Sequence, residues 1–289
     1  MPHSAPDVPH TNVQHSDVWH SEIWFVDIAA AAPALQAFEA RHLLLSAAEH
    51  ERAAALRDDL VRNEWLAAHI ALRAIVGRGC GPDVARQTFA VTERGKPFLA
   101  QSPYAFSLSH APGVALIGLS AGRMIGVDIE RHREVRIGDA RRAGIEAAAA
   151  HLSVDVLPVD PTMRFLQAWV RIEALAKADG RGVGRMLTRL GVRGRAAAPP
   201  PADASGLGDD IAPIAARARA VLAGADQEVE LAEQTTAPEP PSQGARALTV
   251  TDLAVAEGLY AAVASEAGAG PVVCRRLPDH LEGLEKLFG

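Results

Sequence analysis

The sequence predicts an α+β protein, and three stretches of its 289 residues support this prediction. Residues 22–28 form a short apolar run that is typical of a strand. Residues 104–130 alternate apolar and small polar side chains between turn residues, as antiparallel strands do. Residues 162–180 place apolar side chains at helical spacing. Together they indicate antiparallel-rich sheets packed by helices.

Composition excludes several classes of protein. The formal net charge is −6, so the chain lacks the overall basic character of a nucleic-acid-binding protein. Cys80 and Cys274 are too few for a disulfide framework or a cysteine-based zinc site, which favours a reducing compartment. No run reaches the roughly 18 apolar residues of a membrane span, and the N-terminus does not resemble a signal peptide. We therefore expect a cytoplasmic protein without a membrane segment.

The strand at 22–28 is followed by residues 45–79, where apolar positions at three- to six-residue spacings predict one or two helices. Ser46 precedes Glu49 by three residues, the spacing of a capping box. Glycines from Gly77 onward and Pro82 are expected to end this helical region.

The segment 104–130 predicts a three-stranded meander, because turns at 111–113 and 121–122 divide it into three short strands. A helix over 138–152 follows, and prolines at 158 and 161 break it before the helix over 162–180, which Gly180 ends.

The later part of the chain alternates linkers and strands. Residues 196–246 are rich in proline, alanine and glycine, which is typical of a linker or insertion, with one short helix candidate inside it at 211–225. Three late strands are expected at 247–253, 258–265 and 271–277.

Acidic side chains on two of these elements can converge. Asp128 and Glu130 are two residues apart on a strand, so they project from one face. Glu173 and Lys177 are four residues apart on a helix, so they share a face with Trp169. Three carboxylates together are unfavourable unless a cation binds them, and oxygen ligands of this kind suit Mg²⁺. A lysine one turn away would complement the phosphates of a substrate.

A purely structural explanation exists for each fragment. Asp128 and Glu130 are also typical of a solvated strand end, paired with Arg131 or Arg133. Glu173 and Lys177 are also typical of a surface ion pair, which contributes only a few tenths of a kcal/mol.

The order of the motifs favours a functional site. The chain carries "GKPFL" at 95–99, "FSLSHAPG" at 106–113, "IGVDIE" at 125–130 and "WVRIEALAKADGRGVG" at 169–184. This ordered set resembles the 4′-phosphopantetheinyl transferase superfamily, of the surfactin-synthetase-activating (Sfp-like) type. The resemblance covers about residues 45–184, with a weaker echo at 258–265.

The resemblance implies a fold of two similar halves related by a pseudo-twofold, with coenzyme A (CoA) between them. The halves would be residues 21–123, on the nucleotide side of CoA, and residues 124–289, on the metal and pyrophosphate side. Residues 1–20 would form a flexible tail and residues 196–246 an insertion. Two halves in one chain favour a monomer.

The resemblance also implies an activity, namely Mg²⁺-dependent transfer of phosphopantetheine from CoA to a serine of an apo acyl or peptidyl carrier protein. By position, the metal ligands are Asp128, Glu130 and Glu173; the catalytic residues are Glu173 and Lys177; and the CoA contacts are Arg62, Arg73, Lys96, Ser109, His110 and Lys177. Glu173, or a water that it shares with the metal, would be the base.

One departure leaves an alternative open. The family has a lysine directly before the helix glutamate, whereas this chain has Ile172. Arg171 lies on nearly the opposite side of the helix from Glu173, because successive residues turn by about 100°. A catalytically weak or inactive member that binds CoA or a carrier protein is therefore the second hypothesis. A generic Mg²⁺–nucleotide enzyme is the third, although the sequence lacks the phosphate-binding Gly-x-x-x-x-Gly-Lys-Ser/Thr motif.

A basic segment follows the helix. It carries Arg181, Arg185, Arg189, Arg193 and Arg195 without an acidic residue. Carrier proteins of the family are typically acidic around their modified serine, so this segment is a candidate docking surface; a solvated basic loop or strand is the alternative.

Overall fold

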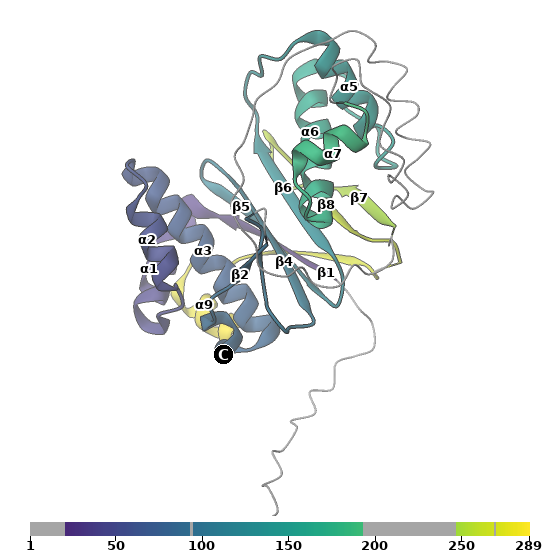
Figure 1. Cartoon of the computed structure of the whole chain (residues 1–289). Helices are drawn as coiled ribbons and strands as arrows, with labels where there is room; N and C mark the ends of the chain where they lie inside the picture. The colour runs from purple at the N-terminus through teal and green to yellow at the C-terminus, as the bar shows by residue number, and fades with distance from the viewer. Residues whose placement is uncertain (1–20, 93–94, 193–246, 269) are drawn as a thin grey trace, which may run out of the picture.

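A computed structural model describes residues 21–92, 95–192, 247–268 and 270–289. Within these residues it contains eight helices and three small sheets, which confirms the α+β class. Figure 1 shows the helices gathered into two groups, one on each side of the strands. None of the described helices is both long and apolar enough to cross a membrane. The pseudo-twofold between two halves stays a prediction.

The first sheet has the order β4–β5–β1–β9. Its strands are β1 (Ser21–Asp27), β4 (Tyr104–Ala111), β5 (Val114–Ala121) and β9 (Val272–Arg276). Strand β5 is antiparallel to both β4 and β1, whereas β9 is parallel to β1. The predicted strands at 22–28 and 271–277 are therefore confirmed, and the structure pairs them although about 250 residues separate them in the sequence.

The second sheet has the order β6–β8–β7, and both of its pairings are antiparallel. Its strands are β6 (Ile125–Arg131), β7 (Leu248–Asp252) and β8 (Leu259–Glu266). A separate two-stranded ribbon joins β2 (Ala90–Val91) to β3 (Pro97–Phe98). The late strands predicted at 247–253 and 258–265 are confirmed.

The predicted three-stranded meander is wrong in its third strand, because β6 pairs with β8 and not with β5. Serine side chains of β4 occupy the free edge of β6. The amide N–H of Val127 donates to Ser107 Oγ (3.1 Å), and the amide N–H of Ile129 donates to Ser109 Oγ (3.4 Å). These side-chain hydrogen bonds join β4, the edge strand of the first sheet, to β6, the edge strand of the second, without a backbone ladder.

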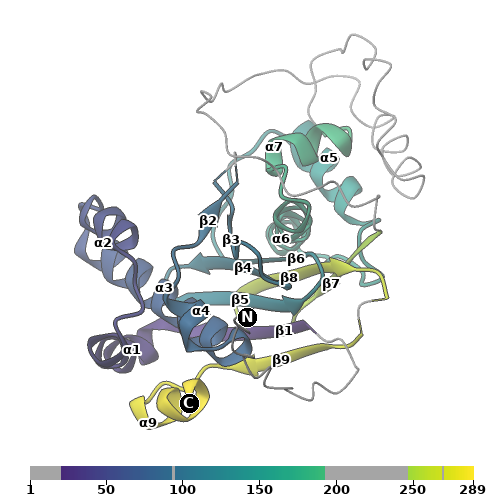
Figure 2. The same cartoon turned by 60° about the horizontal axis from the view of Figure 1, so that its bottom comes forward.

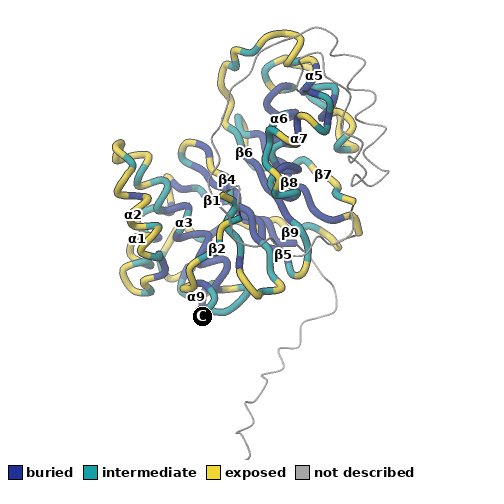
Figure 3. Tube along the Cα trace, in the orientation of Figure 1, coloured by how far each residue is buried: buried dark blue, intermediate teal, exposed yellow. Residues whose placement is uncertain are grey.

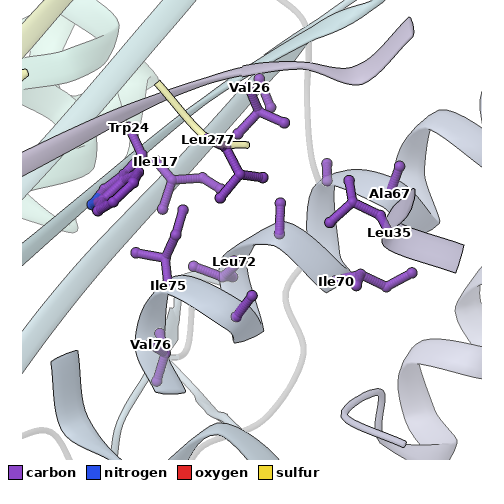
Figure 4. Close-up of a cluster of buried hydrophobic side chains, with 14 of the residues drawn as sticks. Trp24, Val26, Leu35, Ala67, Ile70, Leu72, Ile75, Val76, Ile117 and Leu277 are labelled. Carbon is purple, nitrogen blue, oxygen red and sulfur yellow. The ribbon is translucent and has the colours of Figure 1, made fainter. Parts of the chain in front are cut away.

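One group of helices covers the first sheet. It contains α1 (Ile28–His42), α2 (Ala47–Ala54), α3 (Asp59–Cys80), α4 (Pro82–Arg86) and α9 (Leu281–Phe288). In Figure 4, Trp24 and Ile117 of the sheet lie against Leu72 and Ile75 of α3, which together form part of a buried apolar cluster. Burial of this face is the main stabilising contribution of this half of the molecule.

In the second group, α6 (Pro161–Asp179) covers the other sheet, and α5 (Asp139–Ala149) and α7 (Val183–Arg189) pack against α6. A third apolar cluster, which includes Ile23, Leu116 and Val127, lies between the two sheets. The molecule is therefore layered as helices, sheet, sheet, helices (Figure 2), and the buried residues concentrate along the strands (Figure 3).

Several local predictions are confirmed. Ser46 and Glu49 form the capping box of α2, and Gly180 ends α6 in the left-handed conformation at φ 77°. Two differ in detail. Gly77 lies inside α3, which ends at Cys80 with Gly81 as its C-cap, and Pro161 begins α6 because proline suits the first turn of a helix. The helix candidate at 211–225 and the linker at 196–246 lie outside the described residues.

Helices α1, α7 and α9 were not expected from the sequence. Helix α1 contains Pro33 within an alanine-rich stretch, and α7 lies in the basic segment for which a solvated loop or strand was the alternative to a docking surface. Helix α9 is short, although Leu281, Leu284 and Phe288 do follow helical spacing.

Candidate functional site

The site exists because helix α6 packs directly on strand β6, and Gly126 permits this close approach. A Cβ atom at position 126 would overlap Ala174 O and Ala178 N of the helix backbone. On the opposite face of the strand, Ile125 and Val127 belong to the cluster between the sheets. Strand alternation therefore turns the even-numbered residues of β6 toward α6, as the sequence predicted.

Asp128 lies at the centre of the site and is 5% exposed. Its Oδ1 atom accepts hydrogen bonds from Ser109 Oγ (2.7 Å) and from Lys177 Nζ (2.6 Å). Lys177 Nζ also donates to Ser109 Oγ (2.9 Å), so three elements, β4, β6 and α6, meet at one cluster. Burial raises the pKa of Asp128, while the Lys177 charge opposes the shift.

Glu173 is one helical turn before Lys177 and faces the same acidic cluster. Burial raises the pKa of Glu173 to about 6, and the nearby charges of Asp128 and Glu130 add to this effect. Glu130 itself pairs with Arg133, since its Oε1 lies 3.2 Å from the guanidinium. The charges of Asp128 and Glu130 thus act on Glu173, and Glu130 also makes the ion pair with Arg133 that was the structural alternative.

A pocket of about 370 Å³ opens beside this cluster. Its lining includes the predicted residues Lys96, His110, Glu173 and Lys177. Phe106, Leu108 and Val183 supply apolar surface to the same pocket. A pocket with an apolar lining and a few convergent charged groups is typical of a small-molecule site.

Two of the pocket's basic groups are weakened by burial. Burial lowers the pKa of Lys96 to about 8, and the ammonium donates to the backbone carbonyl of Lys177 at the end of α6. Burial also lowers the pKa of His110, and the Lys177 charge acts in the same direction. Both groups are therefore less basic than free side chains, and anions in the pocket would favour their charged forms.

His69 lines the pocket as well, and the sequence analysis missed it. Its Nδ1 lies 2.9 Å from Trp65 O, and the ring stacks on the indole of Trp65 at 3.6 Å between centroids. Because a carbonyl only accepts hydrogen bonds, Nδ1 carries the proton. Burial lowers the pKa of His69 to about 4, so the ring is neutral near pH 7. A single histidine on an apolar helix gave no signal that could have identified it.

Neither Arg73 nor Arg62 lines the pocket. Arg73 is 1% exposed, bonds Glu49 through Nε (2.9 Å to Oε2) and donates to backbone carbonyls, including Gln87 O (2.9 Å). A contact between Arg73 and a CoA phosphate would first require these bonds to break. Arg62 binds Asp59 and the carbonyl of Leu56 at the start of α3.

Neither Ile172 nor Arg171 directs a cation toward the pocket, and Arg171 points away from it as helix geometry predicted. Ile172 is fully buried in the apolar cluster beneath α6. Arg171 points away from the pocket, where its Nε and Nη2 donate to the carboxylate of Asp252 at 2.8 and 2.6 Å. Arg171 therefore supplies no cation to the pocket, and its role is to tie α6 to β7.

The basic segment after α6 is partly neutralised. Arg181 and Arg189 both bind Asp179, at 2.8 and 2.9 Å. Burial would raise the pKa of Asp179, but these two guanidinium groups together hold it below its ordinary value. Arg185 is exposed and makes no ion pair with another described residue. Arg193 and Arg195 lie outside the described residues.

The donor set fits a hard divalent cation chemically. The acidic oxygens are of the type that Mg²⁺ prefers, and Asp128 Oδ2 is buried with no hydrogen-bond partner, which leaves one oxygen open to a ligand. The described residues nevertheless contain no assembled group of three or more metal-ligating side chains. Lys177 holds Asp128 Oδ1 and Arg133 holds Glu130, so binding would require these ion pairs to rearrange.

The raised pKa of Glu173 has a measurable consequence. Without divalent metal, Glu173→Gln is expected to stabilise the protein at pH 8 by up to about 2 kcal/mol, at about 1.4 kcal/mol per pKa unit. A carboxyl whose pKa is raised in the folded state stabilises the protein fully at pH values below its ordinary pKa of 4.5. This stabilisation is lost as the pH rises through the folded-state pKa of about 6. The measurement is urea unfolding in EDTA between pH 4.5 and pH 8.

The control for this experiment is Glu134→Gln, which removes a carboxylate that is 79% exposed. Its unfolding free energy should follow the wild-type curve across the same pH window. Parallel curves for the wild type and Glu173→Gln would contradict the raised pKa of Glu173.

No family model matches the chain. Among curated proteins, it is 28% identical over 130 residues to the 4′-phosphopantetheinyl transferase HetI of Nostoc sp., a match that covers 43% of this chain and 55% of that protein. It is also 28% identical over 170 residues to a phosphopantetheinyl transferase of Thraustochytrium sp., covering 49% of this chain and 54% of the relative. The chain thus spans about half the length of the curated relatives it matches.

Proposed function

Since the chain is a distant homologue of the 4′-phosphopantetheinyl transferases over about half its length, we propose that it acts on coenzyme A and a carrier protein. It moves the 4′-phosphopantetheine group of CoA onto a serine of an apo acyl or peptidyl carrier protein and releases adenosine 3′,5′-bisphosphate. The observation that carries this proposal is the cluster of Asp128, Glu173 and Lys177, of which Glu173 and Lys177 line a pocket with further basic groups.

The pocket suits a polyanion with an apolar part. Lys96, His110 and Lys177 line it and can neutralise phosphates, and phosphate oxygens in turn favour the charged forms of Lys96 and His110. Leu108 and Val183 offer surface for the apolar faces of a nucleotide. A ligand with several phosphates and a nucleoside, such as CoA, matches this lining.

Asp128, Glu130 and Glu173 would hold Mg²⁺, which supplies charge neutralisation at the CoA pyrophosphate. Lys177 binds the pyrophosphate beside them and stabilises the negative charge that the leaving phosphate gains. Helix α6 and strand β6 fix these side chains in advance, since Gly126 holds the two elements in contact.

Glu173 acts as the general base. The serine hydroxyl of the carrier attacks the β-phosphorus, its oxygen forms a new P–O bond, and the bond to the leaving 3′,5′-bisphosphate breaks. The serine proton passes to the Glu173 carboxylate, directly or through one water. A pKa of about 6 leaves Glu173 mostly ionised near pH 7.5 and still basic enough to accept a proton.

The carrier docks on the exposed basic surface of helix α7. Arg185 is exposed there, and Arg181 and Arg189 flank it although both are shared with Asp179. An acidic carrier surface would be attracted to Arg185 first, because its charge is not neutralised by an ion pair among the described residues.

Ile172 favours a second candidate function, which is binding of CoA or a carrier protein with little turnover. The family lysine at this position is replaced by a side chain that is fully buried. One phosphate-facing cation is therefore absent, and the pyrophosphate relies on Lys177 and the metal.

Intact-mass spectrometry of apo carrier proteins tests the proposal. A panel of fatty-acid, polyketide and peptide-synthetase carriers is incubated with the protein, CoA and Mg²⁺. The expected result is a mass gain of one phosphopantetheine group on at least one carrier, lost when EDTA is added. Binding of CoA without any mass gain would support the second candidate, and the absence of both would refute the assignment to this family's chemistry.

A further inference from the structure

We infer that Lys177 is the resident counter-ion of Asp128 in the ligand-free protein, and that it couples the binding of the metal to the binding of CoA. The inference rests on the proposed function, because it concerns the same site. Lys177 leaves Asp128 when it binds the pyrophosphate, and this movement frees the Asp128 oxygen for the metal.

The contacts of Lys177 show what it must exchange. Its ammonium lies 2.6 Å from Asp128 Oδ1 and 2.9 Å from Ser109 Oγ. The side chain is 30% exposed and lines the pocket, so the ammonium is open to the pocket and is not sealed in the core. It can therefore turn toward a phosphate without unfolding its helix.

Asp128 needs a cation at all times. The carboxyl is 5% exposed, and burial raises its pKa, so an unpaired charge there would be costly. The Ser109 hydroxyl already donates to Oδ1, whereas Oδ2 has no partner. One oxygen is thus saturated by Ser109 and Lys177, while the other is buried and open. The Lys177 ammonium thus occupies one of the two Asp128 oxygens that a metal could otherwise bind.

Two consequences follow from this exchange. The metal alone must compete with Lys177 for Asp128, so its affinity is reduced in the absence of CoA. When the Lys177 ammonium binds the CoA pyrophosphate instead of Asp128, that competition ends and the metal binds more tightly. Because such coupling is reciprocal, bound metal must increase the affinity for CoA by the same factor.

Mn²⁺ is a suitable probe, since it accepts the same oxygen ligands as Mg²⁺ and the free ion is detected by electron paramagnetic resonance. Its Kd is measured on the wild type, Lys177→Gln and Lys177→Met, each with and without saturating CoA. Lys177→Gln retains a hydrogen-bond donor for Asp128 and guards against misfolding of the methionine variant. Circular dichroism confirms that each variant is folded.

Lys96→Met is the matched control. It removes a second ammonium of the pocket, one that binds the carbonyls of Lys177 and Ile125 and makes no bond to Asp128. Loss of any nearby positive charge strengthens metal binding somewhat, and this variant measures that general effect, which we expect to stay within about threefold.

Without CoA, both Lys177 variants are expected to bind Mn²⁺ about tenfold more tightly than the wild type, the lower end of what a charge-assisted hydrogen bond contributes. With CoA, the wild type should gain about tenfold more affinity for Mn²⁺ than the Lys177 variants gain. Lys177 variants that bind Mn²⁺ no more tightly than the wild type, or no more tightly than Lys96→Met, overturn the inference.

The experiment separates this inference from the proposed function. The Mn²⁺ measurement without CoA reports on Lys177 and Asp128 even if no carrier is ever modified. Transfer to a carrier, together with unchanged Mn²⁺ affinity in the Lys177 variants, refutes the coupling role alone. Tighter Mn²⁺ binding without CoA binding or transfer supports the Lys177–Asp128 exchange and refutes the proposed function.

Discussion

Replacing Asp128 with asparagine is expected to lower the rate of phosphopantetheine transfer by about a thousandfold, the size of effect seen when a key electrostatic contact is lost. The chain should remain folded, because asparagine keeps the shape of the side chain and its carbonyl oxygen can still accept from Ser109 and Lys177. Burial raises the pKa of Asp128, so removal of the charge is not expected to reduce the free energy of unfolding at pH 7. The measurements are the rate of carrier modification and the urea midpoint.

Asp139→Asn is the control for this variant. Asp139 is an exposed residue in the first turn of α5 and does not line the pocket. Transfer by this variant should stay close to that of the wild type. Full activity in folded Asp128→Asn protein would remove Asp128 from the metal site.

Replacing Gly126 with alanine is expected to lower transfer at least a hundredfold, since displacements of about 1 Å in a catalytic site have effects of this size. The added Cβ overlaps the backbone of α6 at Ala174 and Ala178, and a helix backbone cannot move aside as a flexible side chain can. Helix α6 must shift away from β6 and carry Glu173 and Lys177 with it. Overpacking of this kind should also lower the free energy of unfolding by about 2 kcal/mol.

Gly138→Ala provides the comparison. Gly138 is exposed, has a φ of −62° and has no atom near its hypothetical Cβ, so alanine fits there. Loss of a glycine at a helix N-cap should cost less than about 1 kcal/mol and leave transfer unchanged. Equal activities for Gly126→Ala and Gly138→Ala would show that the close packing of α6 on β6 is not needed.

The sequence predicted those parts of the fold that depend on local periodicity. Helix α6 was expected at 162–180 and lies at Pro161–Asp179, because its apolar positions, its terminal Gly180 and its proline boundary all agree. The same periodicity predicted which side chains of β6 and α6 face each other, since two-residue and four-residue spacings are properties of single elements.

The pairing of strands was less predictable. Strands β5 and β6 are joined by a short turn, which favours a meander, yet β6 pairs with β8 from more than a hundred residues later. Long-range pairing depends on complementary surfaces that local patterns do not encode. The serine hydroxyls that occupy the β6 edge were visible in the sequence only as alternating polar residues.

In the candidate site too, local spacing predicted some residues, whereas long-range packing decided the others. Asp128, Glu173 and Lys177 were predicted as one group, and the structure brings them together. Arg73 was expected at the ligand, but its helix turns it inward against Glu49, a partner that sequence spacing cannot identify. His69 was missed because its importance arises only from the pocket that it lines.

Strand β9 completes the first sheet from the far end of the chain, parallel to β1. A ribosome releases β9 about 250 residues after β1. Until then, β1 pairs with β5 on one side and presents unpaired N–H and C=O groups on the other, the kind of open edge that recruits strands from other molecules. During synthesis, β1 therefore has an open edge until β9 has been made. Holdase chaperones that shield open strand edges would act during this period.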